Sequence, residues 1–172
     1  MNVGYVHTFE VPENNIDKGR LKVSVVNEEN VPIKGAAVRL SYTGNPDNII
    51  MIQGAEKYLG YPYVWGGSSP STSFDCSGFV SWVINHCGVG WNVGRLGAEG
   101  LRNICSYVSP ANAKPGDLIF FEKTYDTSGA SHVGIYVGNN MMIHCGDPIQ
   151  YTSIDTNYWQ QHFLQFGRLP SP

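Results

Sequence analysis

Several features that would mark a membrane protein or a secreted precursor are missing from this 172-residue sequence. No run of about 18 consecutive apolar residues occurs, the length that crosses a bilayer as a helix, so no membrane span is expected. The first residues, 1–7, have neither the basic stretch nor the apolar stretch of a secretory signal. We therefore expect either an intracellular protein or a mature or excised piece of a longer chain.

Positive charge is also scarce. Eleven Lys and Arg residues stand against 14 Asp and Glu residues, which gives a formal net charge of −3, and the basic residues form no cluster. Binding to nucleic acid depends on such a cluster, because the phosphate backbone supplies most of the affinity. Nucleic acid is therefore not expected as a partner.

Closely spaced cysteines are missing as well, since no C-x-x-C motif is formed by the four that occur: Cys76, Cys87, Cys105 and Cys145. A zinc knuckle is not indicated, and a domain of this length does not need disulfides. Zinc ligands drawn from further apart would include His144 and Cys145, but neighbours on a strand point to opposite faces. We expect no metal or other cofactor and assign Cys87 and Cys105 to the core, while Cys145 is either free or paired.

The chain changes character near residue 45. Within residues 1–45, the segment 20–43 alternates apolar and polar side chains around a turn-rich centre, which predicts a β-hairpin. A lone hairpin is only marginally stable in water, so residues 1–45 are interpreted as a hairpin extension or the remnant of an upstream β-domain. Residues 46–172 are long enough to form one domain with its own core.

In residues 46–172, predicted helices come first and strands follow. The first helix begins with Asn45 as N-cap and Pro46, ends at Gly60, and has an apolar face formed by Ile49, Ile52, Ala55 and Leu59. The second begins at Cys76 and closes at Gly88. Strands are expected over residues 117–122, 132–137, 141–145, 149–154 and 163–169. This order indicates an α+β fold with an antiparallel sheet.

Cys76 occupies the first turn of the second predicted helix, between Asp75 and Ser77. A thiol is a weak nucleophile until it loses its proton, and both the positive end of a helix and a nearby imidazolium favour the thiolate. The alternative is a small buried residue without a chemical role. The polar neighbours and the position at the helix start favour the nucleophile.

His132 and His144 lie on two predicted strands that are joined by a turn at residues 138–140. Whether the two imidazoles share a face of the sheet depends on the register of this hairpin. A regular two-residue turn would place them on opposite faces, so we predict a three-residue turn or a bulge. His132 would then act as general base, and His144 would orient it.

An aromatic segment precedes the cysteine helix and contains Tyr63 and Trp65. These side chains are either part of a core and turn, or the wall of a substrate groove in which a tyrosine hydroxyl donates to a developing oxyanion. Asp75 also has two interpretations. It is either only a helix N-cap, or a carboxylate that receives a substrate ammonium group.

Residues 47–170 resemble the NlpC/P60 family of cell-wall cysteine peptidases. The resemblance rests on five segments that occur in the family's order: 58–67 (YLGYPYVWGG), 74–79 (FDCSGF), 114–121 (KPGDLIFF), 132–138 (HVGIYVG) and 142–144 (MIH). It implies a papain-like α+β fold, in which an antiparallel sheet packs against the helix that carries the catalytic cysteine.

The resemblance also implies a function: hydrolysis of peptidoglycan stem peptides, typically between γ-D-glutamate and the diamino acid, which is meso-diaminopimelate or L-lysine. Cys76 would be the nucleophile, His132 the base and His144 the third polar residue. The expected substrate-binding residues are Tyr63, Asp75, Ser77, the groove-wall residue Trp65 and, by a looser match, Arg95.

The implied location is extracellular, at the cell wall of a bacterium. The chain is also similar to C-terminal domains of cell-wall hydrolases on conjugative elements, which implies an upstream glycan-cleaving or anchoring domain as a partner. Two other functions share the same motifs. One is an N-acetylmuramoyl-L-alanine amidase or acyltransferase with the same Cys/His site, and the other is a catalytically idle wall-binding module.

Overall fold

The computed structural model describes residues 45–172, so the hairpin predicted over residues 20–43 lies outside the described residues. The helices of the described part are α1 (Pro46–Glu56), α2 (Cys76–His86), α3 (Ala98–Ile104), α4 (Asn157–His162) and a short 3-10 helix (Pro110–Asn112). The first two confirm the helices predicted from the sequence, whereas α3, α4 and the 3-10 helix were not predicted.

Helix α1 begins as the sequence predicts, because the Asn45 side chain accepts a hydrogen bond from the Asp47 N–H. Its end is different. The helix stops at Glu56, so Leu59 falls in the following turn and is 43% exposed, and the prediction that it belongs to the apolar face is wrong. The buried residues of α1 are Met51, Gly54 and Ala55.

Helix α2 starts at Cys76 because the Asp75 side chain caps it by accepting a hydrogen bond from the Gly78 N–H. Its buried face carries the apolar residues expected from the helical spacing, Phe79, Val80, Val83 and Ile84. Gly78 is required here, since a Cβ at this position would overlap the carbonyl oxygen of Gly67. This close approach fixes the aromatic segment before α2 against the helix start.

Eight strands complete the described part. Two short ones, β1 (Ser68–Ser69) and β2 (Ser73–Phe74), form a separate pair. The other six form one antiparallel sheet in the order β3-β8-β4-β5-β6-β7: β3 (Ser106–Val108), β8 (Phe163–Arg168), β4 (Leu118–Glu122), β5 (Ala130–Gly138), β6 (Met141–Cys145) and β7 (Ile149–Ser153). The sheet confirms the predicted α+β class. The strands β1, β2 and β3 were not predicted.

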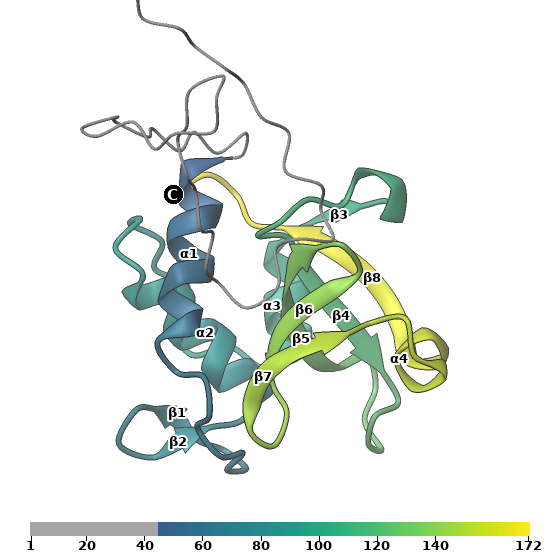
Figure 1. Ribbon diagram of the computed structural model, residues 1–172, viewed down its shortest axis with the longest axis horizontal. Helices are drawn as coiled ribbons and strands as arrows, with labels where there is room; N and C mark the ends of the chain where they lie inside the picture. Colours follow the sequence, from purple (N-terminus) through teal and green to yellow (C-terminus); the bar gives the residue numbers. More distant parts are fainter. Residues whose placement is uncertain (1–44) are drawn as a thin grey trace, which may run out of the picture. The chain divides into compact units, whose positions relative to one another are not determined.

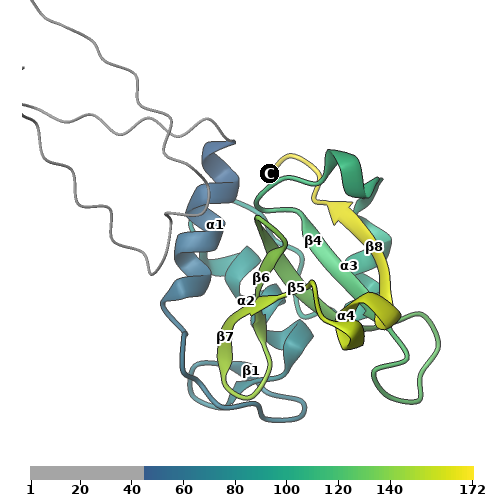
Figure 2. The ribbon, with the colours of Figure 1, turned by 45° about the vertical axis from the view of Figure 1, so that its right-hand side comes forward.

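The two faces of the sheet bury two separate clusters. The larger cluster combines apolar residues of α1, α2 and α3 with alternate residues of β4, β5 and β6. The smaller one includes Phe121, Tyr136 and Met142, with Trp159 of α4 packed against it. Figures 1 and 2 show α1 and α2 together beside the sheet and α4 at one end of β8. Strand β5 contacts α2 through Val133 and α4 through His132.

The register of the β5–β6 hairpin decides how the two histidines meet. Gly138 pairs with Met141 and Tyr136 pairs with Met142, so Val137 is an extra residue that forms a bulge. The turn itself has two residues, Asn139 and Asn140, both with positive φ. The structure thus confirms the bulge of the two predicted alternatives, and the bulge brings the two histidines to one face of the sheet.

Candidate active site

The Cys76 thiol lies at the N-terminus of α2 and is 7% exposed. The backbone N–H of Val133 and that of Ser77 hydrogen-bond to its sulfur atom. Because Val133 directly follows His132 in β5, the thiol rests against the strand that carries the predicted base. The helix and the strand together therefore position Cys76 and His132 at one end of β5.

Burial raises the pKa of the Cys76 thiol to about 11, and the negative charge of Asp75 acts in the same direction. The two backbone N–H groups and the Arg95 guanidinium lower this pKa in part. At neutral pH the sulfur therefore rests as a protonated thiol. The helix start alone would favour a thiolate, but the loss of solvent around the sulfur outweighs this effect. A base therefore has to take the proton during the reaction.

The two predicted histidines hydrogen-bond to each other. His132 Nε2 lies 2.8 Å from His144 Nδ1, and His144 Nε2 lies 2.9 Å from the hydroxyl oxygen of Thr152 on β7. Gly134 leaves room for His144, since a Cβ there would come within 3.2 Å of the His144 Cβ. The His132 Nδ1 atom is then the ring nitrogen that remains for Cys76.

The His144 side chain is buried, at 4% exposed, and the His132 side chain is partly buried. The Trp159 ring packs 5.1 Å from the His132 ring and 5.3 Å from the His144 ring, measured between ring centroids. Burial lowers the pKa of His132 to about 3, with His144 adding to the effect, and burial lowers the pKa of His144 to about 4. At neutral pH both rings are uncharged, which is the form in which a histidine can act as a base.

This pair predicts how stability depends on pH. The folded chain holds both imidazole pKa values below the 6.5 of a free histidine, so the unfolded chain binds more protons below about pH 6.5. The free energy of unfolding is therefore expected to decrease as the pH falls from about 6.5 toward 4. Urea unfolding at both pH values measures this decrease. A variant with His132→Gln and His144→Gln serves as comparison, and an equal pH dependence of the two proteins would contradict the assignment.

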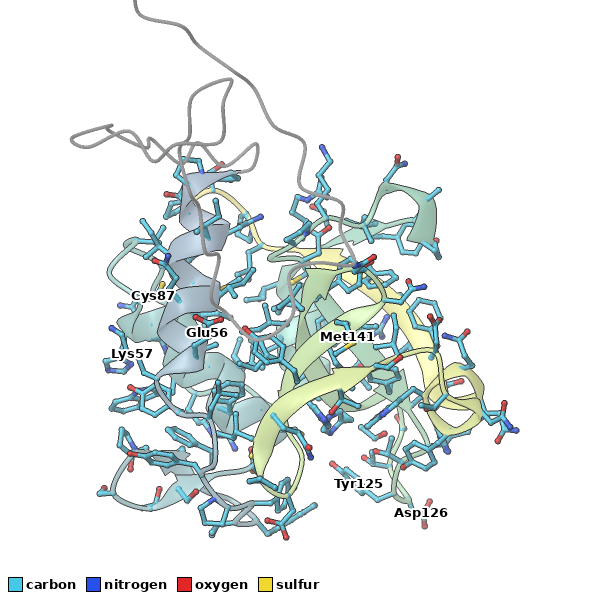
Figure 3. The ribbon with its side chains drawn as sticks, viewed as in Figure 1. Glu56, Lys57, Cys87, Tyr125, Asp126 and Met141 are labelled. Carbon is cyan, nitrogen blue, oxygen red and sulfur yellow. The ribbon has the colours of Figure 1, made fainter. Side chains whose placement is uncertain are left out.

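A groove of about 220 Å³ opens beside the thiol. All five predicted substrate-binding residues line it, together with Cys76: Tyr63, Trp65, Asp75, Ser77 and Arg95. Four further lining residues were not predicted: Gly97, Ala98, Tyr125 and Ser131. Tyr125 is at the tip of the loop between β4 and β5, which projects beyond the sheet (Figure 3). Its ring meets that of Trp65 edge-on at 5.4 Å, and both rings are largely exposed, at 48% and 72%.

Comparison of the sequence with known protein families identifies the same part of the chain. The sequence profile of the NlpC/P60 family matches residues 60–168. The chain belongs to the NlpC/P60 family. The matched residues contain the whole of α2, the β5–β6 hairpin and the groove.

Individual NlpC/P60 relatives are similar over the same part. The chain is 43% identical over 116 residues to "Bifunctional muramidase/DL-endopeptidase CwlT" of Bacillus subtilis, an alignment covering 67% of this chain and 34% of that protein. It is 40% identical over 123 residues to "Gamma-DL-glutamyl hydrolase" of the same species, covering 70% and 29%. A crystal structure of an NLP/P60 family protein from Staphylococcus aureus superposes with a TM-score of 0.68 at 36% identity, covering 78% of this chain and 45% of that one. The chain thus spans about a third of the length of these two curated relatives.

Asp75 combines its capping function with an ion pair. Its carboxylate accepts hydrogen bonds from the Gly66 and Gly78 N–H groups and the Ser77 hydroxyl. The Arg95 guanidinium lies 2.9 Å from both carboxylate oxygens and donates a further bond to the Ser77 hydroxyl. An incoming amino group would therefore meet a paired carboxylate, not a lone one.

The Asp75 carboxylate yields a second prediction. Asp75→Asn removes one of the two causes that raise the Cys76 pKa and leaves the Arg95 charge beside the sulfur. The pKa of the thiol is therefore expected to fall, while an asparagine can still cap α2. The pH dependence of Cys76 alkylation by iodoacetamide, followed by peptide mass spectrometry, measures this shift. The exposed Asp126→Asn variant is the control, and an unchanged or higher midpoint in Asp75→Asn would contradict the prediction.

Tyr63 lines the groove together with Asp75 and Cys76. It forms an isolated bridge with Phe74, and its N–H donates to the Asp147 carboxylate. Burial raises the pKa of the Tyr63 hydroxyl, and the nearby Cys76 and Asp75 raise it further. The hydroxyl therefore stays protonated and remains a hydrogen-bond donor.

The other chemistry-bearing residues of the described part do not extend the site. All four cysteines carry free thiols, and the buried Cys145 sulfur donates to the Phe74 carbonyl oxygen. In residues 45–172 no group of three or more His, Cys, Asp or Glu side chains is arranged to hold a metal ion. No helix in this range is both long and apolar enough to cross a membrane.

Besides the groove residues Gly97, Ala98 and Ser131, sequence reasoning did not find Thr152, Tyr125 and Trp159. Thr152 lies in a strand that was predicted, but a single threonine in a strand carries no chemical signal. Tyr125 belongs to a loop without a motif. Trp159 lies in α4, whose six residues are too few to show a helical period.

Proposed function

We propose that this chain hydrolyses peptidoglycan stem peptides at the bond between γ-D-glutamate and the diamino acid, with Cys76 as nucleophile. The observation that carries the proposal is the arrangement of the reactive groups. A thiol at a helix N-terminus rests against β5, and the His132 of that strand is hydrogen-bonded to His144. Membership of the NlpC/P60 family supports the same chemistry, as do the names of the relatives, DL-endopeptidase and gamma-DL-glutamyl hydrolase.

The reaction begins with proton transfer. His132 Nδ1 takes the proton from the Cys76 thiol as the sulfur attacks the carbonyl carbon of γ-D-glutamate. A base is needed because burial keeps the thiol protonated at neutral pH. The His132 ring, now an imidazolium, is stabilised through its Nε2–H by the His144 Nδ1 atom. The products of this step are a tetrahedral oxyanion and a charged imidazole pair.

The oxyanion is stabilised by donors at the helix start. The Cys76 backbone N–H belongs to the first turn of α2, where N–H groups have no partner within the helix. The protonated Tyr63 hydroxyl supplies a second donor from the groove wall. The amino group of the diamino acid then leaves with the proton from His132. Water attacks the thioester as it gives a proton to the same nitrogen, and the carbon–sulfur bond then breaks, with the proton returning from His132 to the Cys76 sulfur.

The remaining groove residues bind the substrate. Asp75, Ser77 and Arg95 form a hydrogen-bonded cluster that carries both signs of charge beside the thiol. Such a cluster suits a stem peptide, whose amino and carboxylate groups lie close together along the chain. Trp65 and Tyr125 present aromatic faces to the apolar parts of the peptide.

The wider setting belongs to the same proposal. We infer that the enzyme acts in a bacterial cell wall outside the cytoplasmic membrane and requires no cofactor. Residues 46–172 would form the peptidase domain, and residues 1–45 would be an extension or remnant of an upstream β-domain. CwlT pairs its endopeptidase with a muramidase, as its name states, and this chain covers only 34% of it. An upstream glycan-cleaving or anchoring domain is the partner that this comparison supports.

Digestion of purified muropeptides tests the proposed bond. The protein is incubated with monomers of the diaminopimelate type and of the lysine type, and the products are identified by mass spectrometry. Release of a fragment that begins with the diamino acid is the expected result. Release of the entire stem from muramic acid would identify an amidase instead. Binding to sacculi with no new product from either substrate would identify a wall-binding module.

A further inference from the structure

The hydrogen-bonded chain at the active site does not end at His144. Its Nε2 atom lies 2.9 Å from the Thr152 hydroxyl oxygen, and its Nδ1 atom lies 2.8 Å from His132 Nε2. His144 is only 4% exposed, and the Trp159 ring packs against it. Thr152 is therefore the hydroxyl that meets the second nitrogen of a ring sheltered from water.

Two proton arrangements satisfy these hydrogen bonds. In the first, His132 Nε2–H donates to His144 Nδ1, and His144 Nε2–H donates to the Thr152 oxygen. In the second, every bond is reversed, beginning with the Thr152 O–H as donor to His144. A neutral imidazole has one N–H, so the direction of the last bond determines the tautomer of both rings.

Only the first arrangement gives a working base. It leaves a lone pair on His132 Nδ1, the nitrogen that remains for the Cys76 proton. The second arrangement puts a hydrogen on that nitrogen, so His132 has no lone pair there to accept the thiol proton. Both rings are uncharged at neutral pH, because burial lowers their pKa values. Each ring therefore has two possible tautomers at the pH of the reaction.

We propose that Thr152 is a positioning residue for this site: its hydroxyl oxygen accepts the His144 Nε2–H and thereby holds His132 in the tautomer that receives the Cys76 proton. During the transfer, the S–H bond breaks and a bond to His132 Nδ1 forms. The two Nε2–H groups stay in place. Thr152 lies on β7 and pairs with Met142 of β6, so the sheet itself holds its position. The inference rests on the thiol chemistry proposed for Cys76.

The test removes the hydroxyl without changing the shape of the side chain. Thr152→Val has no acceptor, Thr152→Ser restores one, and Ser153→Ala removes a hydroxyl from the next residue of the same strand. The first readout is the rate of Cys76 alkylation by iodoacetamide near pH 7, measured on the Cys76 peptide by mass spectrometry. The second is the tautomer of both rings in the wild-type protein, read from imidazole 15N chemical shifts. Neither readout requires a peptidoglycan substrate.

Thr152→Val is expected to slow Cys76 alkylation by about tenfold or more, because valine leaves the buried His144 Nε2–H without an acceptor and so disfavours the tautomer with a lone pair on His132 Nδ1. Thr152→Ser should keep most of the wild-type rate, and Ser153→Ala all of it. The wild-type spectrum should show both rings as Nε2–H tautomers. The proposal would be overturned if Thr152→Val were alkylated at the same rate as the wild-type protein, or if the wild-type rings were Nδ1–H tautomers.

The spectrum decides the question even if Thr152→Val fails to fold, because it is recorded on the wild type. The readouts also separate this inference from the proposed function. Slow alkylation in Thr152→Val, found with a wild-type protein that cleaves no muropeptide, would support the role of Thr152 and reject the proposed substrate. Muropeptide cleavage by the wild type, together with an unchanged alkylation rate in Thr152→Val, would support the proposed substrate and reject the role of Thr152.

Discussion

Replacing Cys76 with alanine is expected to lower kcat/KM for muropeptide hydrolysis by at least about a thousandfold, or ~4 kcal/mol of transition-state stabilisation. The reason is that the reaction passes through a bond to this sulfur, and no other thiol of the chain lines the groove within the described residues. Cleavage is measured by chromatography of digested muropeptides. Wild-type turnover by Cys76→Ala would reject the nucleophile assignment.

The fold is expected to survive this substitution. The sulfur is nearly buried, but it is a single atom at a helix start, and alanine keeps the helical backbone. The melting temperature should therefore change by only a few degrees. Cys87→Ala is the matched control, because Cys87 lies at the other end of α2, away from the groove. It should retain full activity.

His132→Ala is expected to have the second-largest effect, a loss of about a hundredfold to ten-thousandfold in kcat. The variant removes the group that takes the proton from a thiol whose pKa is about 11. His144→Ala should slow the reaction less, because it removes only the hydrogen-bond partner of His132 Nε2. Steady-state kinetics of both variants on one muropeptide provides the comparison.

The geometry also predicts which replacement rescues His144. Glutamine at this position keeps an acceptor for His132 and a donor for Thr152, so His144→Gln should be more active than His144→Ala. A larger loss from His144→Ala than from His132→Ala would mean that the roles of the two histidines are exchanged. Equal activity of the glutamine and alanine variants would contradict an orienting role.

Local sequence rules predicted the elements that carry the reactive groups. Asn45 and Asp75 are capping residues, and each helix begins where its cap predicts. A bulge was one of the two alternatives predicted from the requirement that both histidines lie on one face of the sheet, and Val137 forms it. Leu59 was misplaced because the helical spacing continues past Glu56, where the helix ends in turns. The short elements β1, β2 and α4 contain too few residues to show a period.

The protonation state of the site was beyond sequence reasoning. The position of Cys76 at a helix start favours a thiolate, yet burial raises its pKa. That burial depends on segments far apart in the chain, such as the strand of Val133 and the loop of Tyr63. The same is true of the histidines, whose pKa values fall because surrounding residues, Trp159 among them, remove solvent from their rings. Such contacts between distant segments leave no periodic or local signal.

The central claim is that the Cys76 sulfur forms a thioester with the γ-carboxyl group of D-glutamate. Trapping with hydroxylamine tests it most directly, because this nucleophile competes with water for a thioester and gives a hydroxamate. Digestion of a muropeptide in its presence is predicted to yield muramoyl-L-alanyl-D-glutamate with the hydroxamate at the γ position, identified by mass spectrometry. A hydroxamate on the muramic acid, or only free carboxylic acid at every hydroxylamine concentration, would contradict the account.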